Sequence, residues 1–231
     1  MSEAGITKKT QVRRIFETIA PRYDLLNHLL SFGFDIYWRK KALKLTGINS
    51  ESILLDAACG TGDVAIEAKK LGAEKIFGCD FSLNMLKLFQ KKSLWAKTNL
   101  IQATAESIPV KNNSVTNITV AFGVRNFYDI REGFKSFYNI LKKNGRLTII
   151  EFSLPKNFFF RTAYSFYFKK ILPLTGRVIS GDKEAYSYLP ESVQEFDEKV
   201  DLKNLLNETG FTGIRDYRLT LGIVQVLIAL K

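Results

Sequence analysis

Short apolar runs alternate with helical patterns between residues 51 and 152, and this alternation constrains the fold more than any other feature of the sequence. The sequence predicts strands at residues 52–57, 75–80, 99–104, 115–122 and 146–152. Helices are predicted between them at residues 63–71, 83–92 and 130–142. Because strands that alternate with helices are joined by right-handed crossovers, this order predicts a parallel sheet with helices on both faces.

The two ends of the chain extend this central pattern. Residues 6–46 predict two helices, because apolar residues recur there at helical spacing. Residues 158–195 lack a clean period and hold most of the aromatic excess, so we expect an insertion that covers the carboxyl edge of the sheet. A helix at 197–209 and strands at 213–219 and 223–230 predict a final helix and β-hairpin.

We therefore expect one α/β domain over residues 1–231, Rossmann-like, with a mixed seven-stranded sheet and helices on both faces. A chain of 231 residues is long enough for such a domain with a full core. Its expected parts are an N-terminal helical extension (1–46), a cofactor-binding core (51–153), a lid or substrate insertion (154–196), and the final helix with its hairpin (197–231).

The cysteine and histidine content argues against disulfide and zinc chemistry. Cys59 and Cys79 cannot form a disulfide framework, and the single histidine, His28, belongs to no cluster with metal-ligand spacing. We expect no metal cofactor and a reducing compartment, the cytoplasm. The N-terminus lacks the apolar core of a secretory signal, and no window approaches the ~20 apolar residues that a membrane span needs.

The formal net charge of the chain is +11. A basic surface attracts polyanions such as nucleic acids and anionic lipid headgroups. The lysines are dispersed along the chain, so the charge is equally compatible with a role in solubility alone.

A glycine loop follows the first predicted strand. Gly60 and Gly62 allow close approach of the backbone to a ligand, and ligands of open α/β sheets bind beyond the carboxyl ends of the strands. Asp80 ends the second strand, where a carboxylate can accept hydrogen bonds from both ribose hydroxyls of a nucleoside. These positions predict a nucleoside site.

The same loop also satisfies the dinucleotide fingerprint, because Ala65 takes the place of the third glycine. Asp56 and Asp63 flank the loop, however, and carboxylates there repel a pyrophosphate but suit the cationic sulfonium and amino group of S-adenosylmethionine. The chain also ends in a predicted hairpin rather than a second mononucleotide half. We therefore favour a methyltransferase over a dehydrogenase.

Several stretches resemble a known family. Residues 55–63 are similar to the first motif of class I methyltransferases. The chain resembles, more narrowly, the demethylmenaquinone and demethoxybenzoquinol C-methyltransferase family (the UbiE type). The narrower resemblance rests on Phe16–Asn27, Ser31–Gly33 through Trp38–Arg39, Phe122–Asn126, Glu151–Pro155 and Tyr186–Ser192. It covers nearly the whole chain and implies the class I methyltransferase fold.

The resemblance implies S-adenosylmethionine as methyl donor, with contacts at Thr61, Asp80, Thr104 and Ala105. Ala121 stands where the family usually has Ser, which removes one hydroxyl hydrogen bond worth ~0.5–1.5 kcal/mol net. The complete predicted cofactor site consists of Asp56, Gly60, Thr61, Gly62, Asp80, Phe81, Thr104, Ala105 and Ala121.

The resemblance also implies C-methylation of a prenylated quinol. We favour the conversion of demethylmenaquinol to menaquinol, the last step of menaquinone synthesis, with the benzoquinol intermediate of ubiquinone synthesis as the alternative. An RNA or a small phenol is a more distant alternative. A quinol becomes a carbon nucleophile when one hydroxyl loses its proton, so the enzyme must assist deprotonation and exclude water.

The candidate catalytic residues are Arg125, Asn126, Tyr188 and His28, with Tyr186 as a further candidate. Arg125 is expected to stabilise a developing phenolate, although its high pKa argues against a role as base. Asn126 is expected to orient a quinol oxygen. His28 and the tyrosines could relay a proton or simply pack or cap, and the sequence identifies no definite base.

The sequence argues against two other functions, nucleic-acid methylation and non-catalytic binding, and it contains one candidate membrane-contacting segment. A nucleic-acid methyltransferase usually carries an Asn-Pro-Pro-aromatic motif after the fourth strand, where this chain has residues 122–126, so we expect no nucleic-acid partner. The intact glycine loop argues against a non-catalytic binding subunit. Phe158 to Leu172, with Lys169 and Lys170, predicts either a lid that contacts the membrane surface or a lid packed on its own domain. The sequence does not indicate the oligomeric state.

Overall fold

A seven-stranded sheet forms the centre of the molecule. The computed structural model describes residues 3–168 and 183–231. The strand order is β3-β2-β1-β4-β5-β7-β6. The strands are β1 (Ile53–Ala57), β2 (Lys75–Asp80), β3 (Leu100–Gln102), β4 (Val115–Ala121), β5 (Leu141–Phe152), β6 (Thr212–Leu219) and β7 (Val224–Leu230). The first five strands pair in parallel and β7 pairs antiparallel with both β5 and β6, which confirms the predicted mixed sheet.

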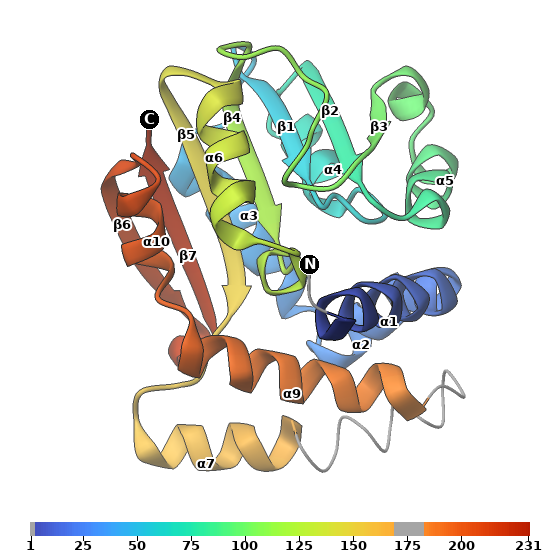
Figure 1. The fold of residues 1–231 in the computed structure, drawn as a ribbon, viewed down its shortest axis with the longest axis vertical. Coiled ribbons are helices and arrows are strands. Elements are labelled where there is room, and N and C mark those ends of the chain that lie inside the picture. The colour runs from blue at the N-terminus through green and yellow to red at the C-terminus, as the bar shows by residue number, and fades with distance from the viewer. Residues whose placement is uncertain (1–2, 169–182) are drawn as a thin grey trace.

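Helices cover both faces of this sheet (Figure 1). On one face, α6 (Ile130–Ile140) and α10 (Leu202–Glu208) pack against the strands. The other face holds α3 (Phe34–Thr46), α4 (Asp63–Lys70) and α5 (Leu83–Lys92), followed by the short helix η2 (Leu94–Thr98). Alternate residues of each central strand enter the two cores, as Leu54 and Leu55 of β1 do, so both faces of the strand are buried.

The remaining helices gather at one end of the sheet. They are α1 (Glu3–Ile19), η1 (Ala20–Arg22), α2 (Tyr23–Leu30), η3 (Val124–Asn126), α7 (Phe158–Phe166), α9 (Lys183–Lys199) and η5 (Thr220–Gly222). Figure 1 shows α1, α2, α7 and α9 lying across the lower end of the sheet, where the arrows of β4 and β5 end. The N-terminal extension and the insertion therefore cover the carboxyl edge together, as the sequence predicts for the insertion.

The insertion is more helical than the sequence pattern indicates. Residues 158–195 lack a clean sequence period and no helix is predicted there, but α7 and α9 occupy most of their described part. The side-chain carbonyl of Asn157 accepts hydrogen bonds from the amides of Phe159 and Phe160, and this cap begins α7. The sequence did not predict this helix, because its four phenylalanines are exposed and obscure any apolar stripe.

Two element boundaries also differ from prediction. The helix expected over 197–209 is divided, because the Asp201 side chain caps a new helix by accepting hydrogen bonds from the amides of Lys203 and Asn204. The strand expected at residue 146 begins at Leu141, and Asn144 takes a left-handed φ of 62° within it. Within the described ranges, no helix combines the length and the apolar content that crossing a membrane requires.

Candidate functional site

A cavity opens at the carboxyl ends of β1, β2 and β4, beneath α1 and α2. We call it the sheet-edge cavity. It is lined by Phe16, Tyr23, Ala58, Gly60, Asp80, Phe81, Met85, Ala103, Thr104, Ala105, Glu106, Ala121, Phe122, Gly123, Asn126, Phe127 and Tyr128. Six of the nine predicted cofactor residues are therefore in the lining. This position is the switch point of the strand order, where open α/β sheets bind their ligands.

Asp80 is the buried charged group of the sheet-edge cavity. Its Oδ2 accepts a hydrogen bond from the Gly60 amide at 2.8 Å, and its Oδ1 accepts one from the Ser82 amide at 2.9 Å. Burial raises the pKa of this carboxyl to about 6, against the lowering effect of the two amides, and nearby Glu17 raises it further. Each oxygen keeps a free lone pair, so the carboxylate can accept further hydrogen bonds from a ligand.

Three predicted cofactor residues lie outside this lining, and each has another contact. The Asp56 carboxylate accepts a hydrogen bond from the Thr119 hydroxyl at 2.8 Å. The Thr61 hydroxyl donates to Asp24 on α2. Gly62 has a φ of 87°, and a Cβ there would lie 2.2 Å from the Phe89 ring, so packing alone requires glycine.

Strained backbone borders the cavity at the ends of two strands. Ala58 follows β1 with a φ of 52°, and Phe122 follows β4 with a φ of 58°. Left-handed φ values are unfavourable for side chains of this kind and cluster at functional sites, where the surrounding structure holds them. The strain thus coincides with the cavity that the glycine loop predicts.

The segment after β3 has two roles at this cavity. Ala105 is buried, and it lines the cavity together with Thr104. The Glu106 carboxylate accepts hydrogen bonds from the amides of Tyr128 and Asp129, at 2.7 and 3.1 Å. Glu106 therefore fixes the loop that precedes α6, in addition to lining the cavity.

A second cavity, of about 370 Å³, adjoins the first, and we call it the apolar cavity. Most of its wall is aromatic or aliphatic. It is lined by Ile15, Phe16, Ile19, Tyr23, Asn27, Ser31, Phe32, Phe34, Asp35, Trp38, Arg39, Phe122, Arg125, Phe152, Pro155, Phe160, Ala163, Tyr164, Tyr167, Phe168, Tyr188, Leu189, Thr220, Leu221 and Ile223. The two cavities share Phe16, Tyr23 and Phe122, so they meet at these three rings.

Arg125 brings a buried positive charge to the wall of the apolar cavity. One guanidinium nitrogen donates to Glu151 at 2.7 Å and to the Phe122 carbonyl. The guanidinium also lies 5.7 Å from the centre of the Phe152 ring. Arg125 thus forms a structural ion pair with Glu151, and it also lines the cavity.

Asn126 and Tyr188 come together although 62 residues separate them in the chain. The Tyr188 hydroxyl donates to the Asn126 side-chain carbonyl at 2.7 Å. Asn126 lines the sheet-edge cavity and Tyr188 lines the apolar one, so their hydrogen bond spans the junction. Burial raises the pKa of Tyr188, which keeps its hydroxyl protonated at neutral pH.

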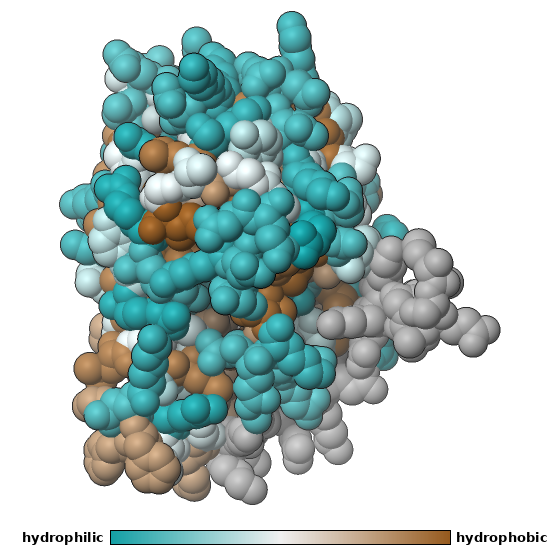
Figure 2. All heavy atoms as spheres, turned by 60° about the vertical axis from the view of Figure 1, so that its left-hand side comes forward, coloured by the Kyte–Doolittle hydropathy of each residue, from teal (hydrophilic) through white to brown (hydrophobic). Residues whose placement is uncertain are grey.

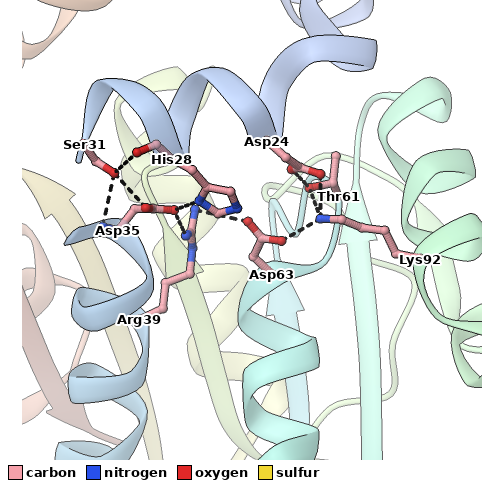
Figure 3. A network of polar contacts seen from close by, with 8 residues as sticks. All are labelled: Asp24, His28, Ser31, Asp35, Arg39, Thr61, Asp63 and Lys92. Atoms are coloured by element: carbon pink, nitrogen blue, oxygen red, sulfur yellow. Dashed lines mark hydrogen bonds and ion pairs between the residues drawn. The ribbon is translucent and has the colours of Figure 1, made fainter. Parts of the chain in front are cut away.

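His28 lies in a separate polar network, drawn in Figure 3. Its Nδ1 is 2.7 Å from Asp35, which also binds Ser31 and Arg39. Arg39 extends to Asp63 at 3.5 Å. His28 is absent from the lining of both cavities, so the structure does not bring it together with Arg125, Asn126 and Tyr188.

Three groups of this network lie close enough to suggest a cation site. Metal-ligating atoms of His28, Asp35 and Asp63 fall within 4.8 Å of one another. The guanidinium of Arg39 contacts both carboxylates, and Lys92 binds Asp63 at 2.6 Å. Protein cations thus already neutralise these carboxylates, and we interpret the cluster as an ion-pair network.

The prediction missed several residues of the N-terminal helices and the insertion. Phe16 and Tyr23 separate the two cavities, and Tyr164 lines the apolar cavity from α7. Burial raises the pKa of Tyr23. Phe16 and Tyr23 fall within a stretch that carries the family resemblance, which was the available signal. No local pattern marks Tyr164. Tyr186, Lys169 and Lys170 of the earlier predictions lie outside the described side chains.

Relatives with curated names match nearly the whole chain. The "Ubiquinone/menaquinone biosynthesis C-methyltransferase UbiE" of Geotalea uraniireducens is 40% identical over 230 residues, which are 97% of this chain and 97% of the relative. The "Demethylmenaquinone methyltransferase" of Bacteroides fragilis is 37% identical over 229 residues, which are 97% of this chain and 94% of the relative.

Solved structures show the same fold at low sequence identity. A SAM-dependent methyltransferase from Thermotoga maritima superposes with a TM-score of 0.63 at 18% identity, over 94% of this chain and 99% of that one. A SAM-dependent methyltransferase from Aquifex aeolicus gives 0.60 at 18% identity, over 85% and 91%. The class I methyltransferase fold is thereby confirmed. Residues 5–231 match the ubiE/COQ5 methyltransferase family, and the chain belongs to that family.

Proposed function

We propose that this enzyme transfers a methyl group from S-adenosylmethionine to a ring carbon of a prenylated quinol. The observation that carries the proposal is the junction of the two cavities at Phe16, Tyr23 and Phe122. The sheet-edge cavity, which holds the buried Asp80 carboxylate, opens there onto the larger apolar cavity. The reaction needs this juxtaposition, because donor and acceptor must be held in line and away from water.

The sheet-edge cavity fits S-adenosylmethionine. The Asp80 carboxylate has acceptor capacity for ribose hydroxyls, and its amide partners hold it in one orientation. Phe81, Met85 and Ala105 supply apolar surface for an adenine ring. When bound there, S-adenosylmethionine supplies an electrophilic methyl group. Asp56 contributes negative charge from behind the loop rather than a direct contact.

The apolar cavity supports the assignment of a quinol with a prenyl tail. Its wall suits an isoprenoid chain, and Arg125 provides one positive charge near the junction. A substrate oxygen that loses its proton gains negative charge, which a fixed guanidinium stabilises electrostatically. Glu151 holds that guanidinium, and the Tyr188–Asn126 hydrogen bond holds the amide at the junction.

The names of the relatives support the substrate class. One relative above is named for demethylmenaquinone alone and the other for both ubiquinone and menaquinone synthesis. We assign demethylmenaquinol as the substrate of this enzyme, with the benzoquinol intermediate of ubiquinone synthesis as the second candidate.

A competition assay tests this assignment. The enzyme and S-adenosylmethionine are incubated under reducing conditions with short-tailed demethylmenaquinol and the matching demethoxybenzoquinol. The products are identified by mass spectrometry. The proposal predicts a gain of one methyl group, mainly on the naphthoquinol. Methylation of the benzoquinol alone would reassign the substrate, and methylation of neither would refute the proposed reaction.

The proposal includes contact with an anionic lipid surface. Phe158 and Phe159 on α7 are 83% and 74% exposed, and Phe32 and Leu221, which line the apolar cavity, are also exposed. Figure 2 shows apolar surface gathered at the lower end of the molecule, around α7. Exposed phenylalanines beside an apolar cavity, on a chain of net charge +11, suit entry of a prenyl tail from a bilayer.

Sedimentation with vesicles tests this contact. Vesicles of mixed zwitterionic and anionic phospholipid at low salt should bind the wild-type protein. The double change of Phe158 and Phe159 to Ser should weaken binding about tenfold or more, because each buried ring contributes roughly 1.5–3 kcal/mol. Leu94→Ser on η2, where Leu94 is similarly exposed, should leave binding unchanged. Equal binding by all three proteins would refute α7 as the contact.

A further inference from the structure

The hydroxyl of Tyr164 is buried, and it has no hydrogen-bond partner among the described residues. Its ring stacks on Phe168, with centroids 4.8 Å apart, and packs in an apolar cluster with Ile15 and Val193. The side chain is therefore held in place by its ring. Its Oη, in contrast, is buried without a hydrogen bond to any part of the chain that the structure describes.

The Nε–H of Arg125 is a second buried donor without a hydrogen-bond partner among the described residues. Arg125 uses one terminal nitrogen to bind Glu151 and the Phe122 carbonyl, but its Nε has no partner among the described residues. Tyr164 and Arg125 both line the apolar cavity. Among the described residues of this cavity wall, the two buried side-chain atoms without a partner are the Oη of Tyr164 on α7 and the Nε of Arg125 on η3.

Unpartnered buried donors point to a missing acceptor. Proteins pair nearly all buried polar groups, because an unpaired group loses its water without compensation. Burial raises the pKa of Tyr164, so its hydroxyl remains a donor at neutral pH, and Arg125 is near enough to oppose that rise. A guanidinium offers only donors. The complementary ligand is an oxygen-bearing group inside an otherwise apolar molecule.

We propose that Tyr164 is a specificity-determining residue, whose hydroxyl and the Nε–H of Arg125 together hydrogen-bond the ring oxygens of the substrate. This inference rests on the proposed function and adds a residue of the insertion to the substrate site. Tyr188 has a different role, because its hydroxyl is already bound to Asn126. The insertion therefore selects the oxygenated ring as well as lining the cavity.

The stability of Tyr164→Phe separates this role from a structural one. A tyrosine whose hydroxyl supports the fold loses stability when the hydroxyl is removed. Since the Tyr164 hydroxyl has no partner among the described residues, the variant should unfold at the same temperature as wild type or a higher one. A clearly lower midpoint would overturn the proposal, because it would reveal a structural hydrogen bond.

The kinetics of the same variant test the substrate contact. Tyr164→Phe should lower kcat/KM for short-tailed demethylmenaquinol about five- to tenfold, the effect of one lost hydrogen bond. S-adenosylmethionine affinity, measured by calorimetry, should stay at the wild-type value. Tyr138→Phe is the matched control, because Tyr138 packs on Phe211 away from both cavities and should keep wild-type kinetics.

Competitive inhibitors that lack one ring hydroxyl complete the test. Two prenylated naphthols, each missing a different hydroxyl, are compared with the quinol on both enzymes. Compared with the quinol, one naphthol should bind much more weakly to wild type but equally well to Tyr164→Phe. This is the coupling expected of a direct contact. Equal losses on both enzymes for both naphthols would overturn the proposal. If wild type methylates no quinol at all, the proposed function fails instead.

Discussion

Two buried aspartates end neighbouring strands, and their different surroundings give them different roles. Asp80 lines the sheet-edge cavity and is bound by two backbone amides. Asp56 lies outside that lining, and one of its oxygens has no partner among the described residues. Burial raises the pKa of both carboxyls, to about 6 and about 7. Asp80 is thus suited to ligand binding, whereas the buried charge of Asp56 destabilises the folded state.

Asp80→Asn should weaken S-adenosylmethionine binding at least tenfold at neutral pH, because a hydrogen bond to a charged group is worth roughly 1.5–3 kcal/mol. Wild-type affinity should also fall as the pH is lowered through about 6, since the carboxyl then takes up a proton. The variant should show no such fall. Calorimetry across this range measures both effects, with Asp201→Asn on the surface as control. Unchanged affinity in Asp80→Asn would remove this residue from the site.

Asp56→Asn tests the electrostatic cost. The carboxyl titrates near 7 when folded and near 3.8 when unfolded, so the folded state alone takes up the proton between these values. The free energy of unfolding of the wild type therefore increases as the pH falls between these values, by at most about 1.4 kcal/mol per pH unit. The unfolding free energy of the variant, relative to wild type, should rise from about pH 4 to about pH 7. A difference independent of pH would contradict the assigned burial effect.

At the scale of elements, an ion-pair network joins the N-terminal helices to the core. Lys92 near the end of α5 lies 2.7 Å from Asp24 on α2 and 2.6 Å from Asp63 on α4, and its ammonium donates to Thr61 at 3.0 Å (Figure 3). Because α2 covers the glycine loop through these contacts, they hold one wall of both cavities in position.

Lys92→Met should therefore loosen the N-terminal helices without loosening the sheet. The ions are partly exposed, so the expected loss is about 0.5–1 kcal/mol rather than that of a buried pair. Amide hydrogen exchange read by mass spectrometry should rise in peptides from α1 and α2 and stay constant in β4 and β5. Lys87→Met, an exposed lysine of the same helix, is the control. If the α1 and α2 peptides of Lys92→Met exchange at the wild-type rate, the network does not hold these helices.

Sequence pattern predicts the elements whose signals are local. The parallel strands are apolar runs bounded by loops, and the glycine loop lies directly before its helix, so both could be read along the chain. The contacts of α2 and α9 are not local. Thr61 binds Asp24 across 37 positions and Tyr188 binds Asn126 across 62, and neither pairing leaves a periodic trace. The sheet-edge cavity was thus largely predictable, whereas the apolar cavity was not.

At the scale of the whole molecule, two layers of the chain combine into one site. The sheet and its loops form the nucleoside cavity, and the N-terminal extension and insertion close over its edge to form the apolar cavity (Figure 1). Similarity at 18% identity to distant methyltransferases shows the fold alone. The second layer carries much of the substrate assignment, because it supplies aromatic and aliphatic side chains of α1, α2, α7 and α9 to the apolar wall. Arg125, which lines the same cavity, comes from η3 in the core.

The most direct test of the account locates the transferred methyl group. The enzyme is incubated with short-tailed demethylmenaquinol and S-adenosylmethionine whose methyl carbon is ¹³C, and the product is examined by NMR. We expect one labelled methyl group bonded to a ring carbon, and a strongly reduced yield with Asp80→Asn. A label on a ring oxygen would contradict carbon methylation, and an unlabelled quinol in the presence of bound donor would contradict the assignment of the apolar cavity.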